Sequence, residues 1–126
     1  MIIRPFKPSD LLAIKNIEPH FSESEITQEK ATILVAEENN QIVGFIDFWM
    51  VENEMSIIEI AVKKDWRRKG IATQLFENIE EGRVIHLEVR ASNTPAKKFY
   101  EKLGFQVIGV RNKYYTDGDD AIVMKL

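Results

Sequence analysis

Residues 56–76 read SIIEIAVKKDWRRKGIATQLF, and this stretch decides the fold because a strand pattern passes through a basic turn into a helix pattern. Isoleucine and valine dominate residues 56–62, and apolar residues recur at helical spacing after Gly70. The turn carries five cations within seven residues, namely Lys63, Lys64, Arg67, Arg68 and Lys69. In a chain of net charge −3, this local excess predicts a bound anion. A solvated basic turn is the alternative.

The backbone expected after this turn also favours an anion. The first amides of a helix have no partner inside the helix, so they attract negative charge. Gly70 would let a ligand approach the backbone closely, and Ala72 would keep the next turn slim. The stretch has neither the GxxxxGK[ST] pattern of a Walker A loop nor the GxGxxG pattern of a dinucleotide-binding turn.

Upstream, the pattern predicts a short strand, two helical segments and three strands. The strand lies near residues 2–4, and the first helix, with Ser9 as its N-cap, ends before Pro19. Residues 22–31 predict a short second helix. Residues 32–38, 42–51 and 55–62 predict three strands, and their short connectors are typical of an antiparallel meander.

Downstream, two helices alternate with strands. The helix after Gly70 is expected to end at Gly82, and a second one within residues 92–104 is expected to have Thr94 as its N-cap. The expected strands span residues 84–90, 105–111 and 120–126. The order β-α-α-β-β-β-α-β-α-β-β predicts an α/β (α+β) fold, with a mixed, mostly antiparallel sheet of six to seven strands and helices on both faces.

The composition bounds the class of protein. The 126 residues predict one domain, 1–126, and no cysteine is present for a disulfide, a thiolate zinc site or a cysteine nucleophile. The N-terminus lacks a signal-peptide pattern, and the longest apolar run is too short to span a bilayer, which predicts a cytoplasmic protein with no membrane partner. The negative net charge argues against a nucleic-acid partner. Two isolated histidines predict no metal site.

The wider sequence resembles the GNAT N-acetyltransferase superfamily. Residues 67–72, RRKGIA, match its [QR]xxGx[GA] acyl-CoA loop, and the strand before them ends as in that family. Residues 87–93 (LEVRASN), 99–105 (FYEKLGF) and 114–126 (YYTDGDDAIVMKL) look like the bacterial ribosomal-protein-alanine N-acetyltransferases, the RimI type. The resemblance is good over residues 57–126 and loose before them.

This resemblance implies acetyl-CoA as the acetyl donor. Backbone amides around Gly70 would hold its pyrophosphate, and the end of the strand before the turn would pair with its pantetheine arm. The amide near Val62 would stabilise the oxyanion. The residues assigned to acetyl-CoA in this way are Ile60, Ala61, Val62, Arg67, Arg68, Lys69, Gly70, Ile71, Ala72, Thr73 and Asn93.

The strand at residues 84–90 carries a polar face, which predicts an opening to a cleft or, alternatively, a wet sheet edge. The resemblance implies that Glu88 on this face is the proton acceptor and that Tyr100 is the proton donor, although from the local sequence alone Tyr100 is a core residue. Glu59 is the second candidate for the base and for the substrate site. His86 is expected to be a satisfied polar residue of the strand.

The resemblance also implies a protein N-terminus as the acceptor, with Tyr114 and Tyr115 on the recognition surface. Residues 18–30 are short and lack the Pro-Trp element of the family, so the acceptor is less defined than the chemistry. A small amine, such as a polyamine, amino acid or aminoglycoside, is the alternative acceptor, and a non-catalytic acyl-CoA-binding module is the alternative function. The chain is expected to be a monomer or a homodimer.

Overall fold

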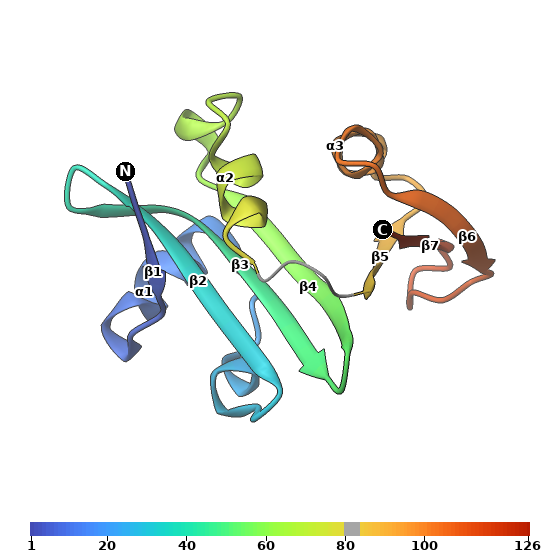
Figure 1. Cartoon of the computed structure of the whole chain (residues 1–126), viewed down its shortest axis with the longest axis horizontal. Helices are drawn as coiled ribbons and strands as arrows, with labels where there is room; N and C mark the ends of the chain where they lie inside the picture. Colours follow the sequence, from blue (N-terminus) through green and yellow to red (C-terminus); the bar gives the residue numbers. More distant parts are fainter. Residues whose placement is uncertain (80–83) are drawn as a thin grey trace.

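The computed structural model describes residues 1–79 and 84–126, which form one seven-stranded sheet with helices on its faces (Figure 1). The strands are β1 (Ile2–Pro5), β2 (Ala31–Glu38), β3 (Gln41–Val51), β4 (Glu54–Val62), β5 (Val84–Arg90), β6 (Gln106–Arg111) and β7 (Ala121–Lys125). The α-helices are α1 (Leu11–Ile17), α2 (Ile71–Glu77) and α3 (Thr94–Lys102). Three short 3₁₀ segments are η1 (Pro8–Asp10), η2 (Glu23–Thr27) and η3 (Lys64–Trp66).

The strand order is β1-β2-β3-β4-β5-β7-β6. All pairs described are antiparallel except β4–β5, which is parallel and is connected through α2. This confirms the predicted mixed sheet and the three-stranded meander. The strand at 84–90 lies between β4 and β7, so the alternative of a sheet edge was wrong. No helix among the described residues is long and apolar enough to cross a membrane.

Each face of the sheet carries its own apolar core. On one face, α2 and α3 cover a large cluster that includes Leu75 and Tyr100. On the other face, α1 packs over a smaller cluster in which the rings of Phe21 and Phe45 meet edge to face, 5.5 Å apart. Gly44 permits the close packing of α2, because a Cβ atom at this position would lie 3.3 Å from the side chain of Ile71 and 3.4 Å from that of Leu75. The predicted helices on both faces are therefore confirmed.

Three local predictions for helices were wrong. Residues 22–31 form only the 3₁₀ segment η2, which has few apolar residues to bury. Ser9 does not cap the first helix, because Pro8–Asp10 already turns as η1 and the Asp10 carboxylate accepts the Lys7 amide at 2.8 Å. Asn93 rather than Thr94 is the N-cap of α3. The predicted helix end at Gly82 lies outside the described residues.

The sheet opens beside β4. Pairing of β3 with β4 runs through Asp47↔Glu59 and resumes at Phe48↔Ile57, so Ile58 is the extra residue of a β-bulge. Pairing of β4 with β5 ends at Ile57↔Leu87, whereas β5 continues by pairing with β7. In Figure 1, β1 to β4 therefore lie on one side of the molecule, and β5, β7 and β6 lie on the other.

Candidate functional site

The unpaired edge of β4 lies where the acetyl-CoA arm is expected. Among the described residues, the segment from Ile58 to Val62 has no partner on its β5 side. Ile60, Ala61 and Val62, the three residues assigned to the arm, lie in this segment and keep their pairing with β3 on the other side. A sheet edge of this kind presents backbone donors and acceptors to an extended ligand.

The basic turn joins the end of this edge to α2. Gly70 at the N-cap has φ 78°, and Arg68 has φ 62°, so two left-handed residues lie two positions apart. Within the described part of the chain, the amides from Arg68 to Thr73 (through Lys69, Gly70, Ile71 and Ala72) donate no backbone hydrogen bond. A run of unpaired amides around left-handed residues forms a concave site for an anion.

The cations of the turn are arranged in different ways. Arg67 Nε donates to the Val62 carbonyl oxygen at 3.0 Å, which holds the turn against the end of β4. Lys69 lies over the Trp66 ring at 5.0 Å. Lys63 donates to the side chain of Gln41 at 3.1 Å. The Arg68 side chain forms no hydrogen bond, ion pair or ring contact with another described residue, so its guanidinium is available to a ligand.

Asn93 caps α3 through its side-chain oxygen, and its Nδ2 donor group is not used by the cap. Its Oδ1 accepts the Ala96 amide at 3.2 Å. Because the oxygen is used by the cap, the Nδ2 group is the part of the side chain left for a ligand. Because Thr94 was the expected cap, the sequence analysis assigned Asn93 only a ligand role and missed its structural role as the cap.

Tyr100 lies in α3 and is 8 % exposed. Its ring contacts Phe99 and Phe105 edge to face, at centroid distances of 5.2 and 5.5 Å. Burial, followed by the negative charge of Glu59, raises the pKa of its hydroxyl. The local expectation of a core tyrosine and the expectation of a proton donor are therefore compatible, since the ring is buried and the hydroxyl stays protonated.

Glu88 faces a groove of about 510 Å³ between β4 and the β6–β7 loop. Its Oε2 lies 3.3 Å from Arg111 Nε. His86 lines the same groove, and its Nε2 has no hydrogen-bond partner among the described residues but lies 3.9 Å from Glu54 Oε2. The full lining comprises Glu54, Ser56, Ile57, Ile58, His86, Leu87, Glu88, Arg111, Tyr114, Tyr115 and Val123.

The β6–β7 loop brings two tyrosines to this groove. Tyr114 and Tyr115 meet edge to face at 5.2 Å, and the Arg90 guanidinium lies 4.0 Å from the Tyr115 ring. Arg90 also binds both carboxylate oxygens of Asp117, at 3.0 and 2.9 Å, which fixes the loop. The structure thus groups Glu88 with both tyrosines of the loop. The carboxylate whose charge raises the pKa of Tyr100 is Glu59.

A group of buried acids was missed by the sequence analysis. Asp47 is 1 % exposed on β3, directly across from Glu59 on β4. Burial, then a hydrogen bond with Glu25 and the nearby charges of Glu25 and Glu59, raises the pKa of Asp47 to about 8. Burial, with the charges of Glu18 and Glu25, raises the pKa of Glu59 to about 7. The signal was present in the sequence, because Asp47 interrupts the apolar run at residues 42–51.

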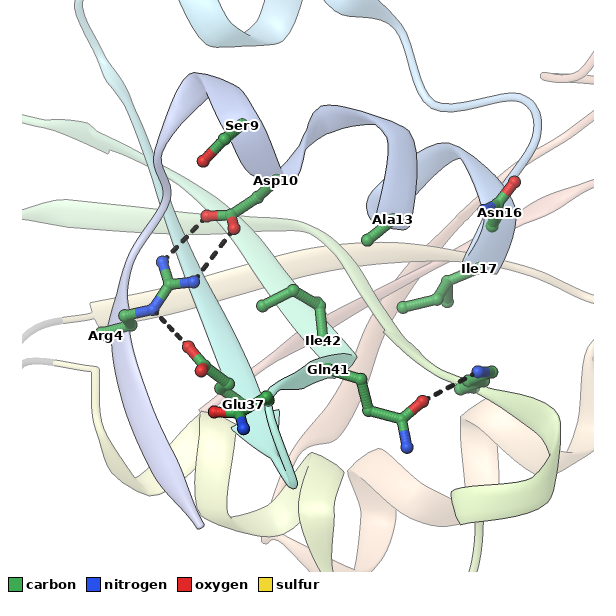
Figure 2. Close-up of a pocket in the computed structure, with 11 residues that line it drawn as sticks. Arg4, Ser9, Asp10, Ala13, Asn16, Ile17, Glu37, Gln41 and Ile42 are labelled. Atoms are coloured by element: carbon green, nitrogen blue, oxygen red, sulfur yellow. Dashed lines mark hydrogen bonds and ion pairs between the residues drawn. The ribbon is translucent and has the colours of Figure 1, made fainter.

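A second cavity, of about 350 Å³, lies between α1 and the strands β1, β2 and β3 (Figure 2). Its most buried polar group, Asp10, accepts two hydrogen bonds from the Arg4 guanidinium, at 2.9 and 3.0 Å. Arg4 also donates to Glu37 at 2.8 Å. Its buried charges are therefore paired among themselves, and it contains none of the expected site residues. Among the described residues, no group of three or more acids or histidines has the arrangement of a metal site.

Comparisons with known proteins show similarity over most of the chain. A family model described as "Acetyltransferase (GNAT) domain" matches residues 9–126. A Bacillus subtilis protein, provisionally named a ribosomal protein bS18-alanine N-acetyltransferase, is 38% identical over 101 residues, which are 75% of this chain and 67% of that protein. An N-alpha-acetyltransferase of Saccharolobus solfataricus is 36% identical over 132 residues, 87% of this chain and 77% of that protein. The crystal structure of the ribosomal-protein-S18-alanine N-acetyltransferase from Escherichia coli has a TM-score of 0.87 at 33% identity and covers 99% of this chain and 92% of that one.

Proposed function

We propose that this chain, which belongs to the acetyltransferase (GNAT) family and is an N-acetyltransferase, moves the acetyl group of acetyl-CoA directly to the α-amine of a protein or peptide. The observation that carries the proposal is the free β4 edge, which leads into a turn of unpaired amides. Two relatives support the acceptor class by their names, one a ribosomal-protein-alanine N-acetyltransferase and the other an N-alpha-acetyltransferase.

The donor would lie along β4 with its diphosphate on the turn. The backbone of Ile60 to Val62 would pair with the amide-containing arm as an added strand. The amides from Arg68 to Thr73 would hold the diphosphate, with Gly70 and Arg68 in the left-handed conformation that turns these amides inward. The Nδ2 group of Asn93 would bind the arm from the opposite side of the opening.

Glu88 would accept the proton of the acceptor ammonium, because only the free amine attacks the thioester. Arg111 orients its carboxylate, and the groove in front of it, with Tyr114 and Tyr115, has room for the first residues of a peptide. Glu59 is the alternative base, and its charge already acts on the donor hydroxyl of Tyr100.

Tyr100 would protonate the departing thiolate. Its raised pKa keeps the hydroxyl protonated across the physiological range until the thiolate develops. An amide near Val62 would stabilise the oxyanion on the thioester carbonyl. The acetyl carbon then forms its new bond to nitrogen as the bond to sulfur breaks, and no covalent enzyme intermediate is needed.

A thiol-release assay with acetyl-CoA tests the proposal. N-terminal peptides, the same peptides with a blocked α-amine, and small amines serve as acceptors. We expect thiol release with free peptides and none with blocked ones. Release with small amines alone would assign the other acceptor class. No release with any amine, together with no increase in melting temperature at millimolar acetyl-CoA, would reject the proposed function.

A further inference from the structure

Four carboxyl groups converge on the face of the sheet that α1 and η2 cover. Glu18 is the C-cap residue of α1, and Glu25 lies in η2. Asp47 and Glu59 are directly opposed on β3 and β4, which places their Cβ atoms about 5 Å apart. Glu25 lies within hydrogen-bonding range of Asp47, and the charges of Glu18 and Glu25 both act on Glu59. We call these four residues the acid cluster.

Asp47 is the least satisfied member of this cluster. It is 1 % exposed, and its Oδ1 atom has no hydrogen-bond partner. A buried polar atom without a partner costs free energy, so the Oδ1 atom of Asp47 can still accept a hydrogen bond from a further donor. The second buried aspartate, Asp10, shows the usual solution, since the Arg4 guanidinium binds both of its oxygens and lowers its pKa.

The acid cluster lacks a cation of its own. Among the residues that the structure describes, no lysine, arginine or histidine side chain forms an ion pair with Asp47, Glu59, Glu25 or Glu18. Glu25 accepts a hydrogen bond from the neutral Trp49 Nε1 group, at 2.8 Å, and Glu18 accepts one from the His20 backbone amide. The nearby Lys30 places its ammonium over the Trp49 ring, at 3.8 Å, rather than on a carboxylate.

The acid cluster adjoins the point of acetyl transfer in the proposed function. Glu59 directly follows the bulged Ile58, where β4 loses its pairing with β5. Ile58 also lines the groove in front of Glu88. The charge of Glu59 reaches the hydroxyl of Tyr100 from the other side of the opening. In the proposed function, an acceptor amine in this opening would lie beside Glu59, the member of the acid cluster on β4.

Resting on the proposed function, we infer that the acid cluster is an acceptor subsite for a second positive charge, an alkylammonium or guanidinium group beside the amine that is acetylated. Such a group supplies the donor that the Asp47 Oδ1 atom lacks and compensates carboxylates that have no cation. Two sources offer this chemistry: the basic side chain of a residue near a peptide N-terminus, and the second amine of a small diamine.

Binding of this cation would also displace protons. In the free protein, the pKa of Asp47 is about 8 and that of Glu59 is about 7, so near neutral pH Asp47 is mostly protonated and Glu59 is protonated in part. A cation seated among them favours their charged forms and lowers both pKa values. The acceptor would therefore release protons from the protein as it binds, and an uncharged analogue would not.

The test compares acceptors that differ in one charge. Norleucine and lysine at the second position of one N-terminal peptide form the first pair, and butylamine and 1,4-diaminobutane form the second. For wild-type protein we expect kcat/KM to favour the charged member of at least one pair by about ten- to a hundredfold, as for a charge-assisted hydrogen bond. The pair that shows the preference identifies the source.

Asp47→Asn removes the carboxyl group that can ionise and keeps the shape of the side chain. We expect it to reduce the charged-to-uncharged ratio toward one. Glu101→Gln, which removes one exposed carboxylate from α3, is the matched control and should leave the ratio unchanged. An equal loss on both members of a pair would make Asp47 structural and overturn the inference, as would equal wild-type kcat/KM values within both pairs.

A calorimetric titration gives a readout that does not need turnover. The diamine and the lysine peptide are titrated into the CoA-loaded protein in two buffers of different ionisation enthalpy, and the difference reports the protons released. We expect proton release near pH 7.5 for wild type and a clear reduction for Asp47→Asn. No proton release with either cation would overturn the subsite, even if thiol release from uncharged amines upholds the proposed function. Absence of thiol release from all amines would reject the proposed function, and the titration would still decide the subsite.

Discussion

Arg111 Nε on β6 lies 3.3 Å from Glu88 Oε2 on β5, so an ion pair crosses over the intervening strand β7. Both side chains are partly exposed, and surface pairs of this kind contribute little to stability. The Arg111–Glu88 ion pair instead orients the Glu88 carboxylate toward the groove that Tyr114 and Tyr115 line. This makes Glu88 a carboxylate whose removal should alter catalysis much more than folding.

For Glu88→Gln, we expect kcat/KM to fall most near neutral pH and to recover as the pH rises. The reason is that the acceptor ammonium loses its proton unaided at high pH, so the base is no longer needed. A pH profile of thiol release for both proteins provides the measurement. A defect of equal size at every pH would argue against the base role and turn attention to Glu59.

For Tyr100→Phe, we expect a loss of about a hundredfold in kcat, the lower range for removal of a general acid. The phenylalanine ring keeps the contacts with Phe99 and Phe105, so the free energy of unfolding should change by less than about 1 kcal/mol. Acetyl-CoA affinity should stay nearly the same. A large loss of affinity with unchanged kcat would show that the hydroxyl has a structural role.

For Gly70→Ala, we expect weaker acetyl-CoA binding and a modest loss of stability, about 1 kcal/mol, from the left-handed backbone. An added Cβ at this position meets no atom within 4 Å, so steric clash inside the protein is not the cause. Gly109→Ala is the matched control, because its Cβ also meets open space but its φ is not positive. Thermal unfolding with and without ligand measures both effects, and equal ligand shifts in the two variants would contradict the prediction.

For Asp47→Asn, we expect stability to depend less on pH. The native pKa of Asp47, about 8, lies above the ordinary value of 3.8, so the folded protein keeps a proton that the unfolded chain releases. The resulting stabilisation is complete below pH 3.8 and is lost as the pH rises through 8, by at most about 1.4 kcal/mol per pH unit for one proton.

Denaturant unfolding of both proteins at pH 5, 6.5 and 8 measures this difference. Glu59, with its pKa raised to about 7, adds a dependence of the same sign that the variant retains in part. The curve of the variant should therefore be flatter but not flat. Parallel curves for the two proteins would show that Asp47 does not hold a proton in the native state.

The sequence predicted the strands and the basic turn because these depend on local patterns. The segment at residues 84–90 forms β5 with the expected bounds, since its alternation is carried by its own residues. The helix caps were harder, because Asn93 and Thr94 are both good caps and only the tertiary position of α3 selects between them.

The parts that the sequence could not predict depend on register between distant segments. The bulge at Ile58 follows from the alignment of β3 with β4, and no residue type at that position signals it. The acid cluster likewise needs α1, η2, β3 and β4 to meet. Asp47 within an apolar run was a visible sign, yet its partners Glu18, Glu25 and Glu59 became evident only from the fold.

The parallel contact between β4 and β5 spans four residue pairs, so two halves of the molecule share a short hydrogen-bonded seam. An extended ligand that pairs with the rest of β4 would lengthen this seam and hold the two halves together. Amide hydrogen exchange in β5 and β7, which lie on the far side of this seam from β4, should then slow when the cofactor binds. Occupancy of the donor site would in this way set how rigidly the acceptor groove is held.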